Sequence, residues 1–168
     1  MRRTLIESLT FSAVCCGLAL ANALLNPSAL SLFTNYAPTA SSAEIEHEFK
    51  SIDSAELASY LDILFDEQPY VMLLDARSKA DYEIAHIPGA HLADHYQQQQ
   101  YLQPLTAALQ QAPIVVVYCK GGDCEDSIFL ARDLVYRYGL ATESLRIYEG
   151  GMNDWLEQQQ PTTTGDKR

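Results

Sequence analysis

The residues whose types and spacing best suit chemistry lie in one short loop, Cys119-Lys120-Gly121-Gly122-Asp123-Cys124-Glu125-Asp126-Ser127. An apolar run at 114–118 precedes the loop, and a helical pattern begins near Ser127. Free backbone N–H groups and the positive end of a helix dipole at such a junction favour an anion and lower the pKa of a cysteine. Gly121 and Gly122 let the backbone curl so that several N–H groups point at one sulfur. We therefore predict that Cys119 is a reactive thiolate, the alternative being a buried structural thiol at a strand end.

Strands that alternate with helices must position this loop. Apolar runs predict strands at 49–52, 71–74, 91–92, 114–118 and 145–148. Helical patterns cover 55–64, capped by Ser54, then 78–85, 97–111 and 127–138, the last ending at Gly139. A final short helix carrying Trp155 follows Gly150-Gly151. This alternation predicts an α/β domain with a mainly parallel sheet.

Several motifs, in order, resemble those of the rhodanese-like domain, a sulfurtransferase family. They are Asp75-Ala76-Arg77, Tyr82, Ala85-His86-Ile87-Pro88-Gly89-Ala90, Val116-Val117-Tyr118-Cys119, Ser127 with Ala131, Leu134 and Gly139, and Tyr148-Glu149-Gly150-Gly151-Met152 with Trp155. Each motif is weak alone, but together they cover about residues 46–160. The resemblance implies one domain with a five-stranded, mainly parallel sheet and helices on both faces.

The family's chemistry implies roles for these residues. Cys119 would attack a sulfane sulfur, form a persulfide and pass the sulfur to a thiophilic acceptor, which is two-step covalent catalysis. The donor would be a small molecule or a protein persulfide and the acceptor a thiol, with no cofactor. His86 is expected to fix a turn rather than act as a base. The active-site loop would comprise Lys120, Gly121, Gly122, Asp123, Cys124 and Glu125, supported by Asp75, Arg77 and Ser127.

The loop departs from the pattern C-R-x-G-x-R-S of many active members. Lys120 replaces the first arginine, the second is absent, and the serine comes two residues later. Asp123, Glu125 and Asp126 should repel the thiosulfate dianion by about 1 kcal/mol or more per close pair, so we expect weak thiosulfate activity. A phosphatase, which shares this fold, is disfavoured because it needs an arginine at the end of the loop to clamp phosphate.

Cys124 is the unusual feature of the loop. The spacing C-x4-C does not match common zinc motifs, and we expect His86, His91 and His95 to be structural, so no metal site is predicted. Cys124 is instead a candidate redox partner that could form a disulfide with Cys119 or resolve its persulfide. An inert, packed Cys124 is the alternative. A non-catalytic binding or redox-sensing module is accordingly the second hypothesis for function, with a protein partner not identified by the sequence.

The charge of the chain is strongly negative and unevenly distributed. The net charge is −11, and residues 41–168 hold nine Lys/Arg and twenty-one Asp/Glu, a net charge of −12. Such a surface argues against nucleic acid, whose phosphates need basic partners. It also argues against docking on anionic lipid headgroups.

The N-terminal segment has a different character. Arg2 and Arg3 precede an apolar stretch at about 9–25 without charged residues, which Asn26-Pro27 should end. Residues 1–27 are interpreted as a membrane anchor, with a cleaved signal peptide or a core helix as alternatives, and 28–45 as a linker. The segment resembles that of membrane-anchored, periplasm-facing members, and the two arginines should keep the N-terminus in the cytoplasm and export the domain. Cys15 and Cys16 suit an apolar helix, and residues 161–168 are predicted as a disordered tail.

Overall fold

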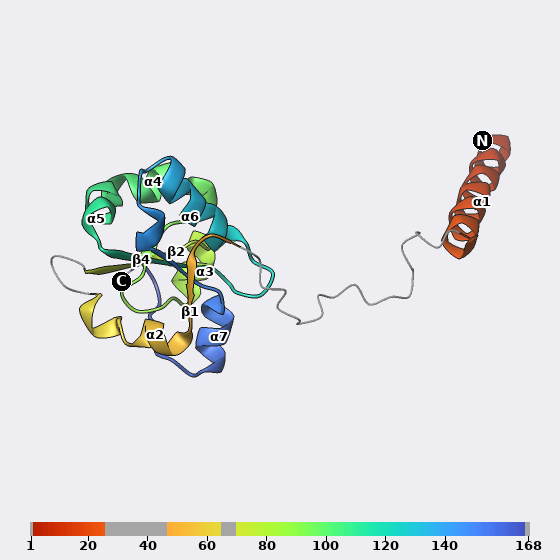
Figure 1. The fold of residues 1–168 in the computed structure, drawn as a ribbon. Coiled ribbons are helices and arrows are strands. Elements are labelled where there is room, and N and C mark those ends of the chain that lie inside the picture. Colours follow the sequence, from red (N-terminus) through yellow and green to blue (C-terminus); the bar gives the residue numbers. More distant parts are fainter. Residues whose placement is uncertain (1, 26–46, 65–69, 167–168) are drawn as a thin grey trace. The chain divides into compact units, whose positions relative to one another are not determined.

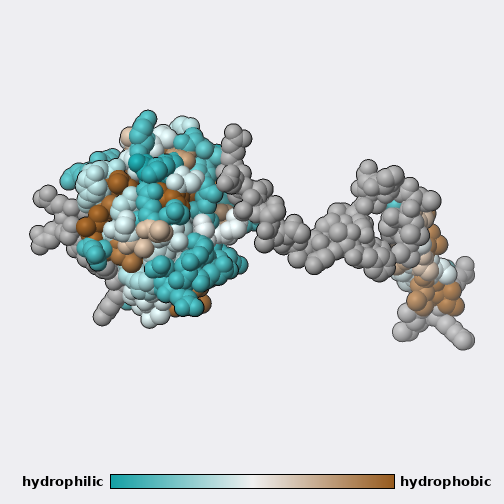
Figure 2. Space-filling view, turned by 60° about the horizontal axis from the view of Figure 1, so that its bottom comes forward, coloured by the Kyte–Doolittle hydropathy of each residue, from teal (hydrophilic) through white to brown (hydrophobic). Residues whose placement is uncertain are grey.

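The chain divides into two units, residues 1–39 and 40–168. The computed structural model describes residues 2–25, 47–64 and 70–166 (Figure 1). The first unit contains α1 (Arg2–Leu25), a helix of 24 residues. Its exposed side chains include the apolar Leu9, Phe11 and Leu18, and the brown atoms of this unit in Figure 2 are hydrophobic residues. The predicted N-terminal helix is therefore present.

Membrane attachment was a further expectation for this segment. Within the described residues 2–25, 47–64 and 70–166, no helix meets the length and hydropathy needed to cross a membrane. The location of the domain stays a prediction. The linker predicted at 28–45 lies outside the described residues.

A five-stranded parallel sheet forms the centre of the second unit. Its strands are β1 (Lys50–Ile52), β2 (Val71–Asp75), β3 (His91–Leu92), β4 (Ile114–Tyr118) and β5 (Leu145–Tyr148). They pair in the order β1-β5-β4-β2-β3, and every pairing is parallel. The sequence prediction of an α/β fold is confirmed. β4 is the middle strand, so the loop that follows it emerges at the centre of the sheet's carboxyl edge.

Helices cover both faces of this sheet (Figure 1). Along β4, Val115 and Val117 enter one core with residues from α4 (Gln98–Leu102), α5 (Thr106–Gln111) and α6 (Asp126–Tyr136). Val116 and Tyr118 enter the opposite core with residues from α2 (Ser54–Ala58), α3 (Lys79–Ile84) and α7 (Gly151–Glu157). This alternation explains the continuous apolar run, because a strand buried on both faces has no solvent side. Short 3₁₀ turns at Leu61–Ile63, His95–Gln97, Gln103–Leu105 and Thr142–Ser144 complete the unit.

Several helix boundaries differ from those predicted. The helix expected at 55–64 ends at Ala58 and is followed by the 3₁₀ turn Leu61–Ile63. The polar helix expected at 97–111 is divided into α4 and α5 by a 3₁₀ turn that contains Pro104, whose ring and missing N–H interrupt helical hydrogen bonding. α2 is capped by the Asp53 side chain, which accepts from the Glu56 N–H at 2.8 Å, rather than by Ser54. α6 begins at Asp126, one residue before Ser127, and ends at Tyr136.

The disordered tail predicted at 161–168 was wrong for residues 161–166. The backbone of Thr163 exchanges two hydrogen bonds of 2.9 Å with His86, and the Gly165 N–H donates to the Glu83 carbonyl at 2.8 Å. The fully buried Trp155 donates its indole N–H to the Pro161 carbonyl at 2.8 Å. The segment is ordered because it supplies acceptors and donors to buried groups that would otherwise lack them.

Removal of this segment should destabilise the domain. Truncation after Gln160 leaves the buried indole N–H of Trp155 without its acceptor, and we expect a loss of about 1–3 kcal/mol in the free energy of unfolding. Urea denaturation followed by tryptophan fluorescence measures the change. Truncation after Asp166 is the control and should be neutral. Equal stability of the two truncated chains would contradict the proposed role of the segment.

Candidate active site

Cys119 lies directly after β4 and begins the loop that leads to α6. Hydrogen-bonded strands flank β4 on both sides, β2 and β5, so the start of the loop is fixed by the sheet. Only 2% of the Cys119 surface is exposed. The carboxyl edge of a parallel sheet is where α/β proteins bind their ligands. The structure therefore places this cysteine where the sequence predicted it.

The loop packs against the glycine pair Gly150-Gly151 at the start of α7. The Met152 N–H donates to the Cys119 carbonyl at 2.9 Å. A β-carbon on Gly121 would lie 2.0 Å from the Gly150 carbonyl oxygen, and one on Gly151 would lie 2.6 Å from the Cys119 carbonyl oxygen. Both Gly121 (φ +90°) and Gly151 (φ +58°) adopt the left-handed conformation. Glycine is therefore required at these two positions by contact as well as by conformation.

Polar groups surround the Cys119 sulfur and lower its pKa to about 6. The largest cause is a hydrogen bond from the Cys124 side chain, and burial opposes it. The Gly121 N–H and the hydroxyl and N–H of Ser127 add to the effect, with Ser127 Oγ 3.5 Å from Sγ. The sulfur also lies 3.0 Å from the carbonyl oxygen of Cys124, to which the protonated thiol donates. At neutral pH the hydrogen-bond donors prevail and Cys119 is mainly a thiolate.

Cys124 has the opposite character. Its pKa is raised above the usual range, chiefly by the hydrogen bond with Cys119, then by burial and by the charge on Cys119. Its sulfur receives the N–H groups of Lys120 and Asp126 and lies 3.6 Å from Asp126 Oδ2. Neither cysteine is in a disulfide. Cys119 is therefore the more acidic thiol of the pair.

A buried network supports the strand end from the opposite core. Asp75 is fully buried and binds Arg77 through two nitrogens, with Nε–Oδ1 at 2.9 Å and Nη2–Oδ2 at 2.6 Å. The Tyr118 hydroxyl donates to Asp75 Oδ2 at 2.7 Å and accepts from the Ile87 N–H at 3.2 Å. Burial and the charge of Asp75 raise the pKa of Tyr118 well above its usual value, so the hydroxyl keeps its proton. Because Tyr118 precedes Cys119, this network fixes the backbone from which the nucleophile projects.

The remaining loop residues lie at the surface. Lys120, Gly122, Asp123 and Glu125 are exposed. Beside the loop lies a cavity of about 430 Å³, whose lining includes Cys124 and excludes Cys119. The other residues that line it are Arg77, Ser78, Asp81, Tyr96, Lys120, Asp126, Met152, Asn153 and Leu156.

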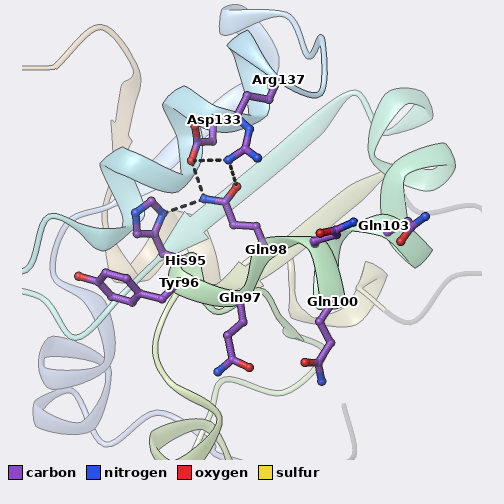
Figure 3. A pocket seen from close by; sticks show the side chains of 9 residues that line it. His95, Tyr96, Gln97, Gln98, Gln100, Gln103, Asp133 and Arg137 are labelled. Carbon is purple, nitrogen blue, oxygen red and sulfur yellow. Dashed lines mark hydrogen bonds and ion pairs between the residues drawn. The ribbon is translucent and has the colours of Figure 1, made fainter.

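A second, more open hollow shares Tyr96 with this cavity. Figure 3 shows the side chains that line the second hollow. Its polar side chains bond one another: Gln98 contacts His95 Nδ1 at 3.0 Å, donates to Asp133, and accepts from Arg137 at 3.2 Å. The Tyr96 hydroxyl donates to Asp126 Oδ1 at 3.2 Å. Tyr96, which lines both spaces, is thus hydrogen-bonded to the first residue of α6.

His86 serves the fold. His86 is fully buried, contacts the Tyr82 carbonyl through Nδ1 at 2.8 Å and stacks on the Tyr82 ring. This is the turn-fixing role predicted from the sequence. Among residues 2–25, 47–64 and 70–166, no group of three or more His, Cys, Asp or Glu side chains is arranged to hold a metal ion.

A comparison with protein families matches residues 57–158, more than half of the chain, to the family described as rhodanese-like domain. The chain belongs to this family. No match was found among curated proteins. The resemblance seen in the motifs is thereby confirmed for the rhodanese-like domain itself.

Solved structures share the fold of this rhodanese-like domain. The BH2092 protein from Bacillus halodurans gives a TM-score of 0.57 at 17% identity, over 70% of this chain and 78% of that one. The rhodanese-like domain of the Alr3790 protein from Anabaena sp. gives 0.53 at 22% identity, over 71% and 82%. Thiosulfate sulfurtransferase from Pseudomonas aeruginosa gives 0.53 at 24% identity, over 71% of this chain but 21% of the sulfurtransferase chain. At these identities the likeness shows the fold alone.

Sequence reasoning missed two parts of this rhodanese-like site. Tyr118 was assigned only to a strand, although a tyrosine in a buried aliphatic run needs a buried acceptor, and Asp75 ends the neighbouring strand. Tyr96 was not considered at all. Its sequence surroundings carry no signal, because its contact with Asp126 joins segments 30 residues apart.

Substitution of the α7 glycine should disrupt the loop. In Gly151→Ala the new β-carbon would clash with the Cys119 carbonyl, so we expect a loss above about 3 kcal/mol in the free energy of unfolding. Gly122→Ala is the matched control, because Gly122 also has positive φ but a β-carbon there meets no atom within 4 Å. It should lose only about 1–2 kcal/mol, the cost of the left-handed conformation. Chemical denaturation compares the two, and equal losses would contradict the close-contact argument.

The low pKa of Cys119 should depend on Cys124. In Cys124→Ala the pKa of Cys119 should rise from about 6 toward the usual value of about 8.5, since the largest stabilising donor is lost. Cys124→Ser keeps a donor and should shift the pKa less. The ultraviolet absorbance of the thiolate against pH, in chains with Cys15 and Cys16 changed to Ser, measures each value. An unchanged pKa in the alanine variant would refute the assigned cause.

Proposed function

We propose that this domain is a sulfurtransferase that carries a sulfane sulfur as a persulfide on Cys119. The observation that carries the proposal is the Cys119 sulfur, held as a thiolate by surrounding donors at the end of the central strand. A thiolate, not a thiol, is the nucleophile in such chemistry. Family membership supports the same conclusion, because sulfur transfer between donors and thiol acceptors is the general chemistry of rhodanese domains.

The reaction would proceed in two displacements. In the first, the Cys119 thiolate attacks the sulfane sulfur of a donor R–S–SH, the donor S–S bond breaks, and R–S⁻ leaves with the electron pair. In the second, an acceptor thiolate attacks the outer persulfide sulfur, and Cys119 leaves as the thiolate. The Gly121 N–H and the Ser127 groups that stabilise the resting thiolate would also stabilise it as leaving group.

The charges beside the loop favour a donor other than thiosulfate. Asp81 and Asp126 line the cavity, and Arg77, the cation nearest to them in the network, is already paired with Asp75. Lys120 adds one exposed cation. Two charges 4 Å apart interact by about 4 kcal/mol at the effective dielectric of a protein surface, so a dianion meets net repulsion. An organic persulfide or a protein-bound persulfide is the favoured donor class.

The N-terminal segment extends this proposal to location. We place the domain outside the cytoplasm, tethered through residues 1–27 or released by signal cleavage. The support is the sequence pattern: two arginines before an apolar stretch, then a domain of net charge −12. A protein that delivers or accepts sulfur in that compartment would be its partner.

Sulfur loading should be visible by intact mass. After brief incubation with glutathione persulfide, we expect a Cys124→Ser chain to gain one sulfur atom, about 32 Da, and the Cys119→Ser/Cys124→Ser chain to gain none. The serine at 124 keeps a donor beside Cys119 while removing the second thiol. Thiosulfate should load the same chain at least about tenfold more slowly, the factor that about 1.4 kcal/mol of repulsion produces. Absence of an adduct with every persulfide donor would favour the binding-module hypothesis.

A further inference from the structure

The two cysteines of the loop lie close together, with Cys119 Sγ 3.0 Å from the Cys124 carbonyl oxygen, but they differ in access. Cys119 is 2% exposed, whereas Cys124 is half-buried and lines the cavity of about 430 Å³. The Cys124 sulfur lies 3.6 Å from Asp126 Oδ2, and the Cys124 side chain is the largest cause of the low pKa of Cys119. A second thiol therefore stands between the nucleophile and the space from which a donor or an acceptor would come.

This arrangement suits attack within the loop. Within the described residues of the second unit, Cys124 is the thiol beside any persulfide that forms on Cys119, and its effective concentration exceeds that of an external acceptor. Its proton has an acceptor at hand, because Asp126 Oδ2 lies 3.6 Å from the sulfur. The Asp126 carboxylate also accepts from the Tyr96 hydroxyl, which holds it in place.

We propose that Cys124 resolves the Cys119 persulfide, so that the loop reduces a sulfane sulfur to hydrosulfide and closes a Cys119–Cys124 disulfide. The proposal rests on the proposed function, since it requires the persulfide to form. It adds a second catalytic residue and a further product. The domain would thus release inorganic sulfide as well as carry sulfur to an acceptor.

The atoms and electrons balance without another reactant in a single turnover. Cys124 loses its proton to Asp126, and its thiolate attacks Sγ of Cys119. The bond between Sγ and the outer sulfur breaks, and the outer sulfur takes the electron pair together with the proton held by Asp126 and leaves as HS⁻. The two cysteines are oxidised by two electrons, and the sulfane sulfur is reduced by two. A thiol or dithiol reductant then restores the pair for the next turnover.

The order of events follows from the charges. In the resting loop, the hydrogen bond to Cys119 and the charge on it raise the pKa of Cys124, so Cys124 does not compete as nucleophile. After sulfur is loaded, the charge lies on the outer sulfur rather than on Sγ. The N–H groups of Lys120 and Asp126 lower the pKa of Cys124. Once the charge on Cys119 Sγ is gone, nothing on Sγ opposes this effect, and the Cys124 thiolate can form. Resolution therefore follows loading instead of preceding it.

The experiment compares the fate of the persulfide with and without Cys124. Full-length chains with Cys15 and Cys16 changed to Ser are loaded with glutathione persulfide, freed from excess donor and followed by intact mass and by sulfide trapping. With Cys124 present, the adduct should disappear, the mass should fall about 2 Da below the reduced chain, and about one equivalent of sulfide should appear. In Cys124→Ser the adduct should persist at least about tenfold longer and release no sulfide.

Other outcomes separate the two proposals. A persulfide equally long-lived in both chains overturns the resolving role and leaves sulfur transfer intact. An adduct found on the peptide containing Cys124 alone means relay to that sulfur, which also overturns resolution. Failure of the Cys124→Ser chain to load would refute the proposed function itself. An Asp126→Asn chain that loads normally but resolves more slowly, with the same pKa of Cys119, supports Asp126 as the proton acceptor.

Discussion

The rest of the site depends on the close approach of two backbone segments, the Cys119 loop and the start of α7. The Cys119 carbonyl accepts from Met152, and this contact forms only because Gly121 and Gly151 carry no side chain. The loop is thereby curled over its own first residue, so that N–H groups face the sulfur instead of solvent. A loop free of α7 would lose conformational order, and the pKa of Cys119 would return toward that of an ordinary thiol.

A buried network of Asp75, Arg77 and Tyr118 adds a second constraint on the position of Cys119. An isolated carboxylate such as that of Asp75 would be expensive to bury, but Arg77 and Tyr118 give it charge-assisted hydrogen bonds. Removal of one partner would leave a buried charge unpaired, which typically destabilises a protein by about 3–5 kcal/mol. The network contacts no reacting atom, yet it fixes the last residue before the nucleophile. The Asp75-x-Arg77 motif therefore positions the nucleophile and takes no direct part in the reaction.

Much of this architecture could be predicted from the sequence because burial leaves a regular pattern. β2 and β4 are continuous apolar runs, and each alternates its side chains between two cores, so their strand character followed directly. The helix predicted at 97–111 is shorter in the structure because Pro104 interrupts a segment whose composition is otherwise helical. The tail at 161–166 was missed because its order depends on partners such as His86 and Trp155, far from it in the sequence. Long-range pairing of this kind has no local signal.

In the candidate site too, some features could be predicted from local sequence and others could not. The position of Cys119, the glycines and Ser127 followed from local sequence, since a strand, a turn and a helix determine where they lie. The opposite pKa shifts of Cys119 and Cys124 did not, because they depend on the side-chain arrangement within the folded loop. Spacing alone left open an inert, packed thiol, whereas the Cys124 side chain is the largest cause of the low pKa of Cys119.

Electrostatics then explains why one charge, and not two, resides on this loop. Two thiolates in contact would repel by about 4 kcal/mol at an effective dielectric of 20, in a domain that already carries a net charge of −12. The backbone donors around Cys119 are sufficient for one anion, so the second sulfur keeps its proton until the first has reacted. Thiosulfate would add two charges at the reacting sulfurs, where the loop stabilises one, whereas the –SSH group of a persulfide brings one at most. The capacity of the loop for one negative charge therefore disfavours a dianionic donor. It also keeps Cys124 protonated and unreactive until the charge on Cys119 Sγ has been lost.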